Sequence, residues 1–170
     1  MDATALRTLQ APIKDKYRSD PDAAVITLKA QGTLDDQHIA CKVETGRALA
    51  VAGLHPATGG SGAELCSGDM LLEALVACAG VTLKAVATAL EIDLRKGTVK
   101  AEGDLDFRGT LGVDKTAPVG FRAIRLAFEV DTDAPQEKID QLLKLTERYC
   151  VVFQTLSHKP ELGVEVRRAS

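Results

Sequence analysis

Two of the four cysteines stand where a thiol could do chemistry. Cys78 lies near the middle of a long, almost wholly apolar helical stretch, and Cys150 ends a second, amphipathic one. A thiol inside a buried helix is usually a small inert hydrophobe. Two thiols on helices that must pack together could instead form a couple, in which one thiol is oxidised by a peroxide and the other condenses with it to a disulfide.

The other two cysteines suggest no chemistry of their own. Cys41 shares one face of an alternating segment with Ile39 and Val43, which predicts a core position, and Cys66 lies in a Gly-rich loop. The chain has no CxxC or CxxH spacing, so we expect no metal site and no cofactor.

A reactive Cys78 would need help from its neighbours, because burial in apolar surroundings raises the pKa of a thiol and makes it inert. Thr82, four residues on, could donate a hydrogen bond to the thiolate or back to the Cys78 carbonyl, and the latter is the commoner fate of a threonine within a helix. A cation could also lower the pKa, although a solvated surface charge is the commoner role. The candidates are Arg47, Arg148, Arg18 and His55.

Hydrophobic periodicity predicts which elements position these residues. The predicted strands cover residues 24–34, 38–45, 47–51, 98–108, 121–130 and 161–168. A helix is expected from an N-cap at Ser67 to about Leu90, with Asp69 in its first turn, and apolar residues on nearly every face of it indicate a buried central helix. A second helix is expected from about Asp133 to Cys150, and 151–156 is left undecided. This order predicts an α+β fold with mainly antiparallel sheets.

Chain length, net charge and the spacing of charged residues limit the classes of protein to which this chain could belong. The 170 residues fit a single domain, residues 23–170, after an N-terminal arm of residues 1–22. A net charge of −3 argues against nucleic acid or an anionic membrane as a partner. Glu73 and Lys84 leave only ten uncharged residues between them, too few to span a bilayer. The four cysteines show no disulfide framework, and free thiols are kept reduced in the cytosol. We therefore expect a cytoplasmic protein.

Four segments together resemble the OsmC/Ohr family of osmotically induced and organic hydroperoxide resistance proteins. They are Thr58-Gly59-Gly60, the helix LLEALVACAGVTLKAVA at 71–87, the strand TVKAEGDLDF at 98–107 and YCVV at 149–152. The resemblance spans roughly residues 24–168. It implies an OsmC-like fold, with antiparallel sheets around the central helix, in an intertwined homodimer whose active sites lie at the subunit interface.

The resemblance also implies roles for particular residues. Cys78 matches the peroxidatic thiol and Cys150 the resolving thiol of the family. Many members carry a Pro-Glu pair at the start of the helix, where this chain has Ser67-Gly68, so Asp69 is the candidate acid. Arg47 is the candidate for the family's arginine, and Val151 replaces the usual proline after the second cysteine.

The function predicted on this basis is a thiol-dependent organic hydroperoxide reductase that uses Cys78, Cys150, Arg47 and Asp69. Its partners would be a second copy of the chain, an organic hydroperoxide and an external dithiol reductant. An alternative is a non-catalytic OsmC-like protein that binds a small apolar or thiol-reactive ligand at the dimer interface. A purely structural domain with inert core cysteines is the third possibility. Apolar composition with only 4% aromatics also favours burial against a second copy.

Overall fold

The computed structural model describes residues 2–19, 31–34, 40–44, 49–112 and 114–168. Of residues 31–34, 40–44 and 49 it describes the backbone only, as it does of residues 9, 13 and 16–18 in the first helix. Arg47, and the side chains of Arg18 and Cys41, therefore lie outside the described part of the chain.

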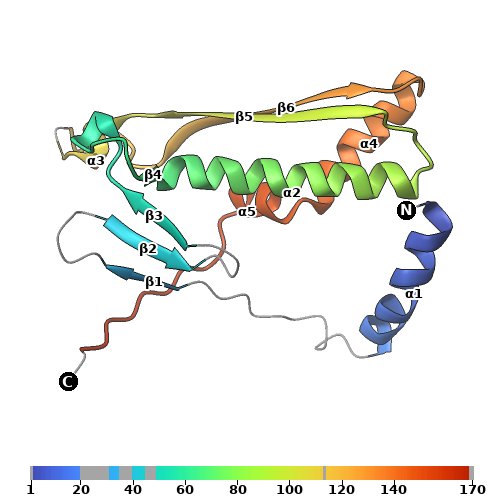
Figure 1. Ribbon diagram of the computed structural model, residues 1–170, viewed down its shortest axis with the longest axis horizontal. Helices are drawn as coiled ribbons and strands as arrows, with labels where there is room; N and C mark the ends of the chain where they lie inside the picture. The colour runs from blue at the N-terminus through green and yellow to red at the C-terminus, as the bar shows by residue number, and fades with distance from the viewer. Residues whose placement is uncertain (1, 20–30, 35–39, 45–48, 113, 169–170) are drawn as a thin grey trace.

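Helices and strands follow one another in a mixed order that agrees with the predicted α+β class (Figure 1). In chain order they are α1 (Ala3–Ser19), β1 (Gln31–Leu34), β2 (Ala40–Glu44), β3 (Leu49–Gly53), the 3-10 turn η2 (Pro56–Thr58), β4 (Leu65–Cys66), α2 (Ser67–Ala89), β5 (Lys96–Leu105), α3 (Phe107–Thr110), β6 (Phe121–Asp131), α4 (Gln136–Tyr149) and α5 (Val151–Ser157).

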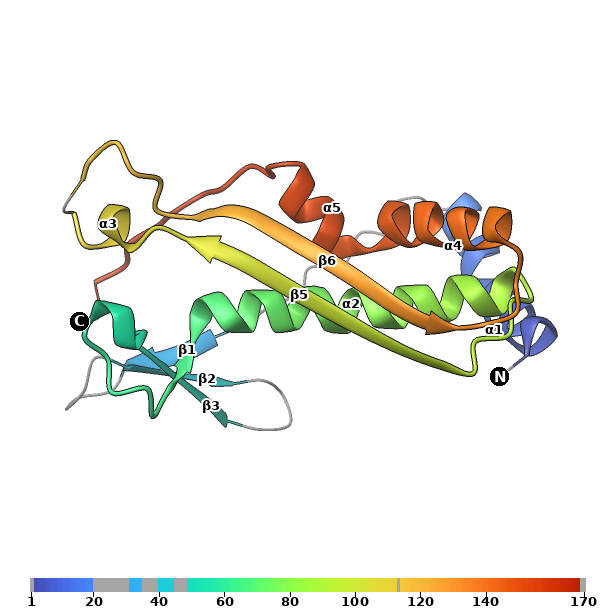
Figure 2. The same ribbon diagram turned by 90° about the horizontal axis from the view of Figure 1, so that it is seen from above.

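The strands form two sheets. β1, β2 and β3 make an antiparallel meander, to which β4 adds in parallel through Ala52 opposite Leu65 and Gly53 opposite Cys66. β5 and β6 form one long antiparallel hairpin that runs obliquely across α2, and α4 and α5 lie along one flank of that helix in Figure 2.

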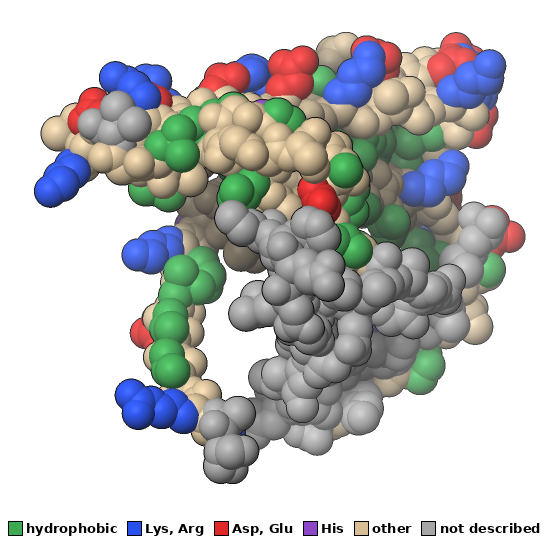
Figure 3. Space-filling model, turned by 60° about the vertical axis from the view of Figure 1, so that its left-hand side comes forward, with side chains coloured by type: hydrophobic (Ala, Val, Ile, Leu, Met, Phe, Trp, Pro, Cys, Tyr) green, Lys and Arg blue, Asp and Glu red, His purple; other side chains and the backbone are tan. Residues whose placement is uncertain are grey.

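The hairpin alternates between an apolar inner face and a charged outer face, as a half-buried sheet should. Val99, Ala101, Ile124 and Leu126 pack inward in the cluster that includes residues of α2. The outer face carries ion pairs across the two strands, such as Lys100 with Glu129, and Figure 3 shows acidic and basic side chains gathered along this edge of the molecule. The hairpin therefore fixes which side of α2 is covered.

Helix α2 ends where the sequence predicted, through a Schellman motif. Glu91 takes a left-handed backbone conformation with φ 57°, the N–H of Ile92 bonds to the carbonyl of Ala87, and that of Glu91 bonds to Thr88. Ile92 is buried against the last turn of the helix, in one cluster with Leu142 of α4. This cluster anchors the end of α2 that lies away from the cysteines.

Several predictions about elements were wrong in detail. Residues 161–168 form no strand in the described structure, although their pattern alternates, because they lie extended and exposed without a partner strand. In Figure 3 this segment stands clear of the body. The N-cap is Cys66 rather than Ser67. The N-terminal arm, which the sequence allowed to be either a loose segment or a short helix, contains the helix α1. The short elements β4 and α3 were missed in segments predicted as loop or strand.

The prediction that α2 is covered on every face is not met within one chain. Its buried residues lie on one side, whereas a stripe at helical spacing stays exposed, which we call the exposed α2 stripe: Leu71, Ala74, Val81 and Ala85. By length and composition alone α2 could cross a membrane, and 22% of its most apolar 18-residue stretch is buried. One such helix is weak evidence, since core helices of soluble proteins pass the same test.

Candidate functional site

The site is built around Cys150, which joins two helices. The N–H of Cys150 bonds to the carbonyl of Thr146 and closes α4, while its own carbonyl accepts the N–H of Gln154 and opens α5. Its extended backbone, with φ −75° and ψ 107°, breaks the helix at this point. Cys150 is 1% exposed, so the break between the two helices directs its thiol into the core.

Cys78, in the middle of α2, packs against the break between α4 and α5. It packs against the buried cluster of Leu75, Ala79 and Cys150, together with Val152. Both cysteines are free thiols. The Thr82 hydroxyl donates to the Cys78 carbonyl at 2.8 Å, the helical back-bond that the sequence favoured. The structure therefore brings together the two thiols that the sequence singled out.

The pKa of the Cys78 thiol is lowered from its ordinary value by its neighbours. Partial burial acts in the opposite direction, because it disfavours the charged thiolate, but hydrogen bonding to the sulfur outweighs burial. The backbone N–H of Val152, the thiol of Cys150 and the backbone N–H of Val151 lower this pKa most, and the side chain of Thr82, whose hydroxyl donates to the Cys78 carbonyl, contributes least. All of these groups are neutral, so none of them brings a full positive charge to the site.

The pKa of the Cys150 thiol is shifted in the opposite direction, upward. Burial raises the pKa of its thiol, and the neighbouring Cys78 raises it further, while the N–H groups of Phe153 and Val152 lower it in part. The two thiols thus have pKa values shifted in opposite directions, that of Cys78 lowered and that of Cys150 raised. This difference is what a nucleophile and a reserve thiol require.

Asp69, the candidate acid, is not brought to Cys78 within one chain. Nine residues along an α-helix correspond to about 13 Å of rise and two and a half turns, which places the two side chains on opposite faces. Asp69 lines an open groove with Leu72 and Val76, on the side of α2 next to β5.

The candidate cations do not meet Cys78 in the described structure either. Arg148 is exposed, and its guanidinium lies 5.8 Å from the centre of the Tyr149 ring. His55 stacks on Phe107 at the far end of the molecule, with ring centroids 4.9 Å apart. The side chains of Arg47 and Arg18 lie outside the described residues, so their predicted roles stay untested.

The remaining cysteines lie apart from the pair. Cys66 is a half-buried free thiol at the start of α2, in a pocket with His55 and Asp69. Cys41 lies in β2, opposite Ala52 of β3, and its side chain is not described. Across the described residues, no group of three or more His, Cys, Asp or Glu side chains is placed to hold a metal ion.

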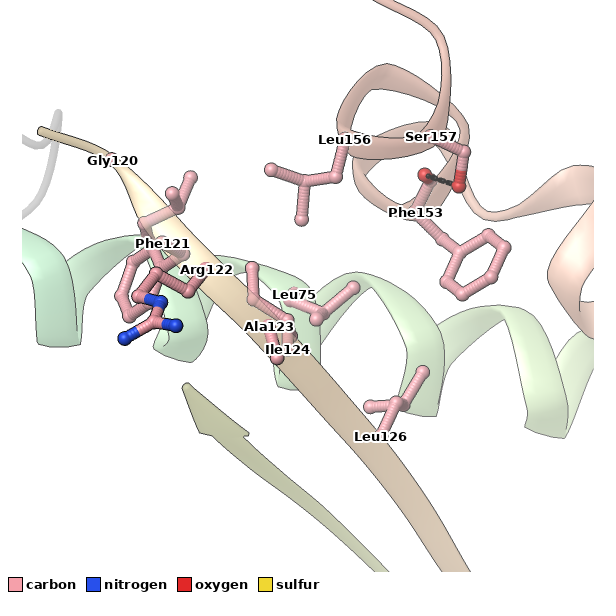
Figure 4. Close-up of a pocket in the computed structure, with 11 residues that line it drawn as sticks. Leu75, Gly120, Phe121, Arg122, Ala123, Ile124, Leu126, Phe153, Leu156 and Ser157 are labelled. Carbon is pink, nitrogen blue, oxygen red and sulfur yellow. Dashed lines mark hydrogen bonds between the residues drawn. The ribbon is translucent and has the colours of Figure 1, made fainter. Parts of the chain in front are cut away.

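An apolar pocket adjoins the thiol pair. It has a volume of about 550 Å³ and lies between the first half of α2, the start of β6 and α5. Leu75 and Phe153 belong both to its lining and to the cluster around the thiols, and Figure 4 shows Leu156 and Ile124 pointing into it with Arg122 at one end. Neither cysteine lines the pocket, which reaches the thiol cluster through Leu75 and Phe153 and gives an apolar molecule a place close to it.

Comparison with known proteins identifies the family. The model of the OsmC-like protein family matches residues 60–165, which include both cysteines of the pair. The chain belongs to the OsmC-like family. Comparison with curated proteins gives no match.

Solved structures of OsmC-like proteins share the fold. An OsmC-like protein from Mycoplasma pneumoniae is 18% identical with a TM-score of 0.65, over 79% of this chain and 89% of that one. An organic hydroperoxide resistance protein from Elizabethkingia anophelis is 15% identical with a TM-score of 0.62, over 80% and 91%. One from Legionella pneumophila is 15% identical with a TM-score of 0.60, over 78% and 91%. At these identities the likeness shows the OsmC-like fold and no more.

Sequence reasoning missed the backbone donors at Val151 and Val152. Their side chains gave no signal, because every residue except proline carries the N–H that matters here. The available clue was the absence of the family's proline after Cys150, which leaves an N–H at position 151.

Proposed function

We propose that this protein is a thiol-dependent organic hydroperoxide reductase, with Cys78 as the peroxidatic thiol and Cys150 as the resolving thiol. The observation that carries the proposal is the pairing itself: Cys78, with its pKa lowered, packs against the buried thiol of Cys150, whose pKa is raised. A nearby apolar pocket suits the organic part of such a substrate.

The chemistry needs two steps. The Cys78 thiolate attacks the outer oxygen of the hydroperoxide, the O–O bond breaks, and Cys78 becomes a sulfenic acid. The leaving alkoxide takes the proton of the adjacent Cys150 thiol and departs as an alcohol. The resulting Cys150 thiolate attacks the Cys78 sulfur and expels hydroxide, which completes a disulfide. An external dithiol then supplies the two electrons that restore both thiols.

We also propose that the working protein is a homodimer in the cytoplasm. The exposed α2 stripe leaves apolar surface that a second copy would cover. Cys78 lies next to this stripe on the helix, so the second copy would also close the solvent side of the site. Arg47 and Asp69 stay proposals within this arrangement, as residues that a dimer could bring to the thiols.

Peroxide consumption tests the proposed reaction. With dithiothreitol as the dithiol, the wild-type protein should consume tert-butyl hydroperoxide catalytically, and Cys78→Ser should not. Cys66→Ser is the matched control and should keep the wild-type rate, because Cys66 lies outside the pair. Equal consumption by wild type and Cys78→Ser would contradict the proposal.

The apolar pocket supports a second function, the binding of a small apolar ligand without turnover. In that case an apolar fluorescent probe should bind wild type and Cys78→Ser equally, and Leu156→Arg should abolish binding because it places a charge in the pocket. Binding without any peroxide consumption would favour this second function over the first.

A further inference from the structure

We infer that Phe121 is a specificity-determining residue, whose ring closes one end of the apolar pocket and limits the length of the chain that the pocket accepts. The occupant would be the straight alkyl chain of an organic hydroperoxide, or of the alcohol that the reaction leaves. The role of Phe121 in choosing substrates rests on the proposed peroxidase function, whereas its limit on the length of a bound chain does not.

A β-bulge at the start of β6 directs Phe121 toward α2. Consecutive residues of β5 pair with Ala123 and Phe121, so Arg122 between them is an extra residue. Farther along β6 the half-buried positions are 124, 126, 128 and 130, and strict alternation would therefore leave position 121 on the exposed face. The extra residue reverses this order, so Phe121 is half-buried while Arg122 is exposed.

Two glycines leave room for the Phe121 ring. A Cβ at Gly103 of β5 would overlap the ring, and a Cβ at Gly68, in the first turn of α2, would lie 3.6 Å from its Cζ. A glycine within a strand is typical of such a close approach. The ring therefore lies between the hairpin and the beginning of α2, held by backbone on both sides.

The ring is also the partition between two pockets. One is the apolar pocket of about 550 Å³, and the other is a pocket of about 380 Å³ that contains Cys66, His55 and Asp69. Among the described residues that line these two pockets, Phe121 alone borders both. Removal of the ring should therefore join the apolar pocket to the second one.

The thiols lie toward the opposite end of the apolar pocket. Figure 4 shows Phe121 and Phe153 at its two ends, and Phe153 belongs to the cluster around the thiols. On α2, Gly68 is close to the ring and Leu75 belongs to the thiol cluster, and these seven residues correspond to about 10 Å of helix. An alkyl chain that starts from the thiol cluster would follow this length of α2 and then meet Phe121.

Straight-chain alcohols can measure the limit, because they resemble the product of the proposed reaction and bind without reacting. Alcohols from n-hexanol to n-tetradecanol would displace an apolar fluorescent probe from the protein. In the wild type, affinity should rise about fourfold with each added methylene until the chain meets Phe121, and then level off. In Phe121→Ala the rise should continue, so that the longest alcohols bind about tenfold more tightly than to the wild type.

Leu156→Ala is the matched control, since Leu156 lines the apolar pocket but not the second one. It should weaken the binding of every alcohol to a similar extent and level off at the wild-type chain length. Phe121→Leu keeps an apolar side chain near Gly103 without the ring, and it replaces Phe121→Ala should that variant not fold. It should move the limit in the same direction by a smaller amount. An unchanged limit in the Phe121 variants, or a wild-type affinity that never levels off, would overturn the inference.

Alkylation of Cys66 tests the same partition without the fluorescent probe. In Phe121→Ala, n-dodecanol should enter the second pocket and slow the alkylation of Cys66 by iodoacetamide, read by peptide mass spectrometry. In the wild type it should leave this rate unchanged. Equal protection of Cys66 in both proteins, or none in Phe121→Ala, would overturn the inference.

The consumption of n-alkyl hydroperoxides separates the limit from the proposed reaction. If the limit moves in Phe121→Ala but neither protein consumes these peroxides, Phe121 still sets the length of the bound chain and the peroxidase proposal fails. If the wild type consumes them and the limit does not move, the peroxidase proposal stands and the role of Phe121 is refuted.

Discussion

Charging the exposed α2 stripe should break the proposed dimer. Val81 is 73% exposed in the single chain and stands one turn from Cys78 on the same side of the helix. We predict that Val81→Glu converts the protein from dimer to monomer at micromolar concentration. The reason is that a dimer would bury this position in both copies.

The size of the effect follows from the area that Val81 still exposes. Complete burial of a valine side chain contributes about 1.5–3 kcal/mol, so the exposed part is worth about 1–2 kcal/mol in each copy. Two copies give about 2–4 kcal/mol, which raises the dissociation constant roughly 30- to 1,000-fold. The buried carboxylate of glutamate adds to this, because an unpaired charge is costly to remove from water.

Light scattering and sedimentation velocity would measure the change. Val119→Glu is the matched control, since Val119 is 64% exposed in the loop before β6, away from the stripe. Val119→Glu should keep the wild-type mass. The reasoning is refuted if Val81→Glu keeps the same mass as the wild type, or if the wild type is itself a monomer.

Further predictions concern stability and pH. Leu142→Ala should lower the free energy of unfolding in urea by about 3 kcal/mol, because Leu142 is fully buried; a loss below about 1 kcal/mol would contradict its core position. Gly60→Ala should destabilise by about 1–3 kcal/mol or more, because a Cβ there overlaps the Leu54 carbonyl, whereas Gly163→Ala has open space and should be neutral; equal effects would count against the overlap. Alkylation of Cys78 should persist below the pH at which a free thiol, of pKa about 8.5, loses reactivity, and should decline as pH falls through the lowered pKa; a midpoint at or above the free value would contradict the site.

Much of the fold was predictable because its signals are local. The apolar run from Ser67 and the stop near Glu91 gave α2 its limits, and the alternation in 98–108 and 121–130 gave the long hairpin. The absence of a strand at 161–168 was not predictable in the same way. Alternation shows that a segment could pair, but pairing depends on a second strand that the segment itself does not encode.

The site was predictable only in part. Two apolar helical segments that must pack together led to Cys78 and Cys150, and the structure places these two side by side. The position of Asp69 was readable from helix geometry, since nine residues place it on the opposite face. The two amide donors were not readable, because their role depends on the break between α4 and α5, and the sequence left residues 151–156 undecided.

The most direct test of the account is the disulfide formed after one equivalent of tert-butyl hydroperoxide. Peptide mapping by mass spectrometry should find a Cys78–Cys150 cross-link in the wild type, none in Cys78→Ser, and a sulfenic acid at Cys78 in Cys150→Ser. A cross-link through Cys66 instead, or a wild-type protein left fully reduced, would contradict the two-thiol mechanism.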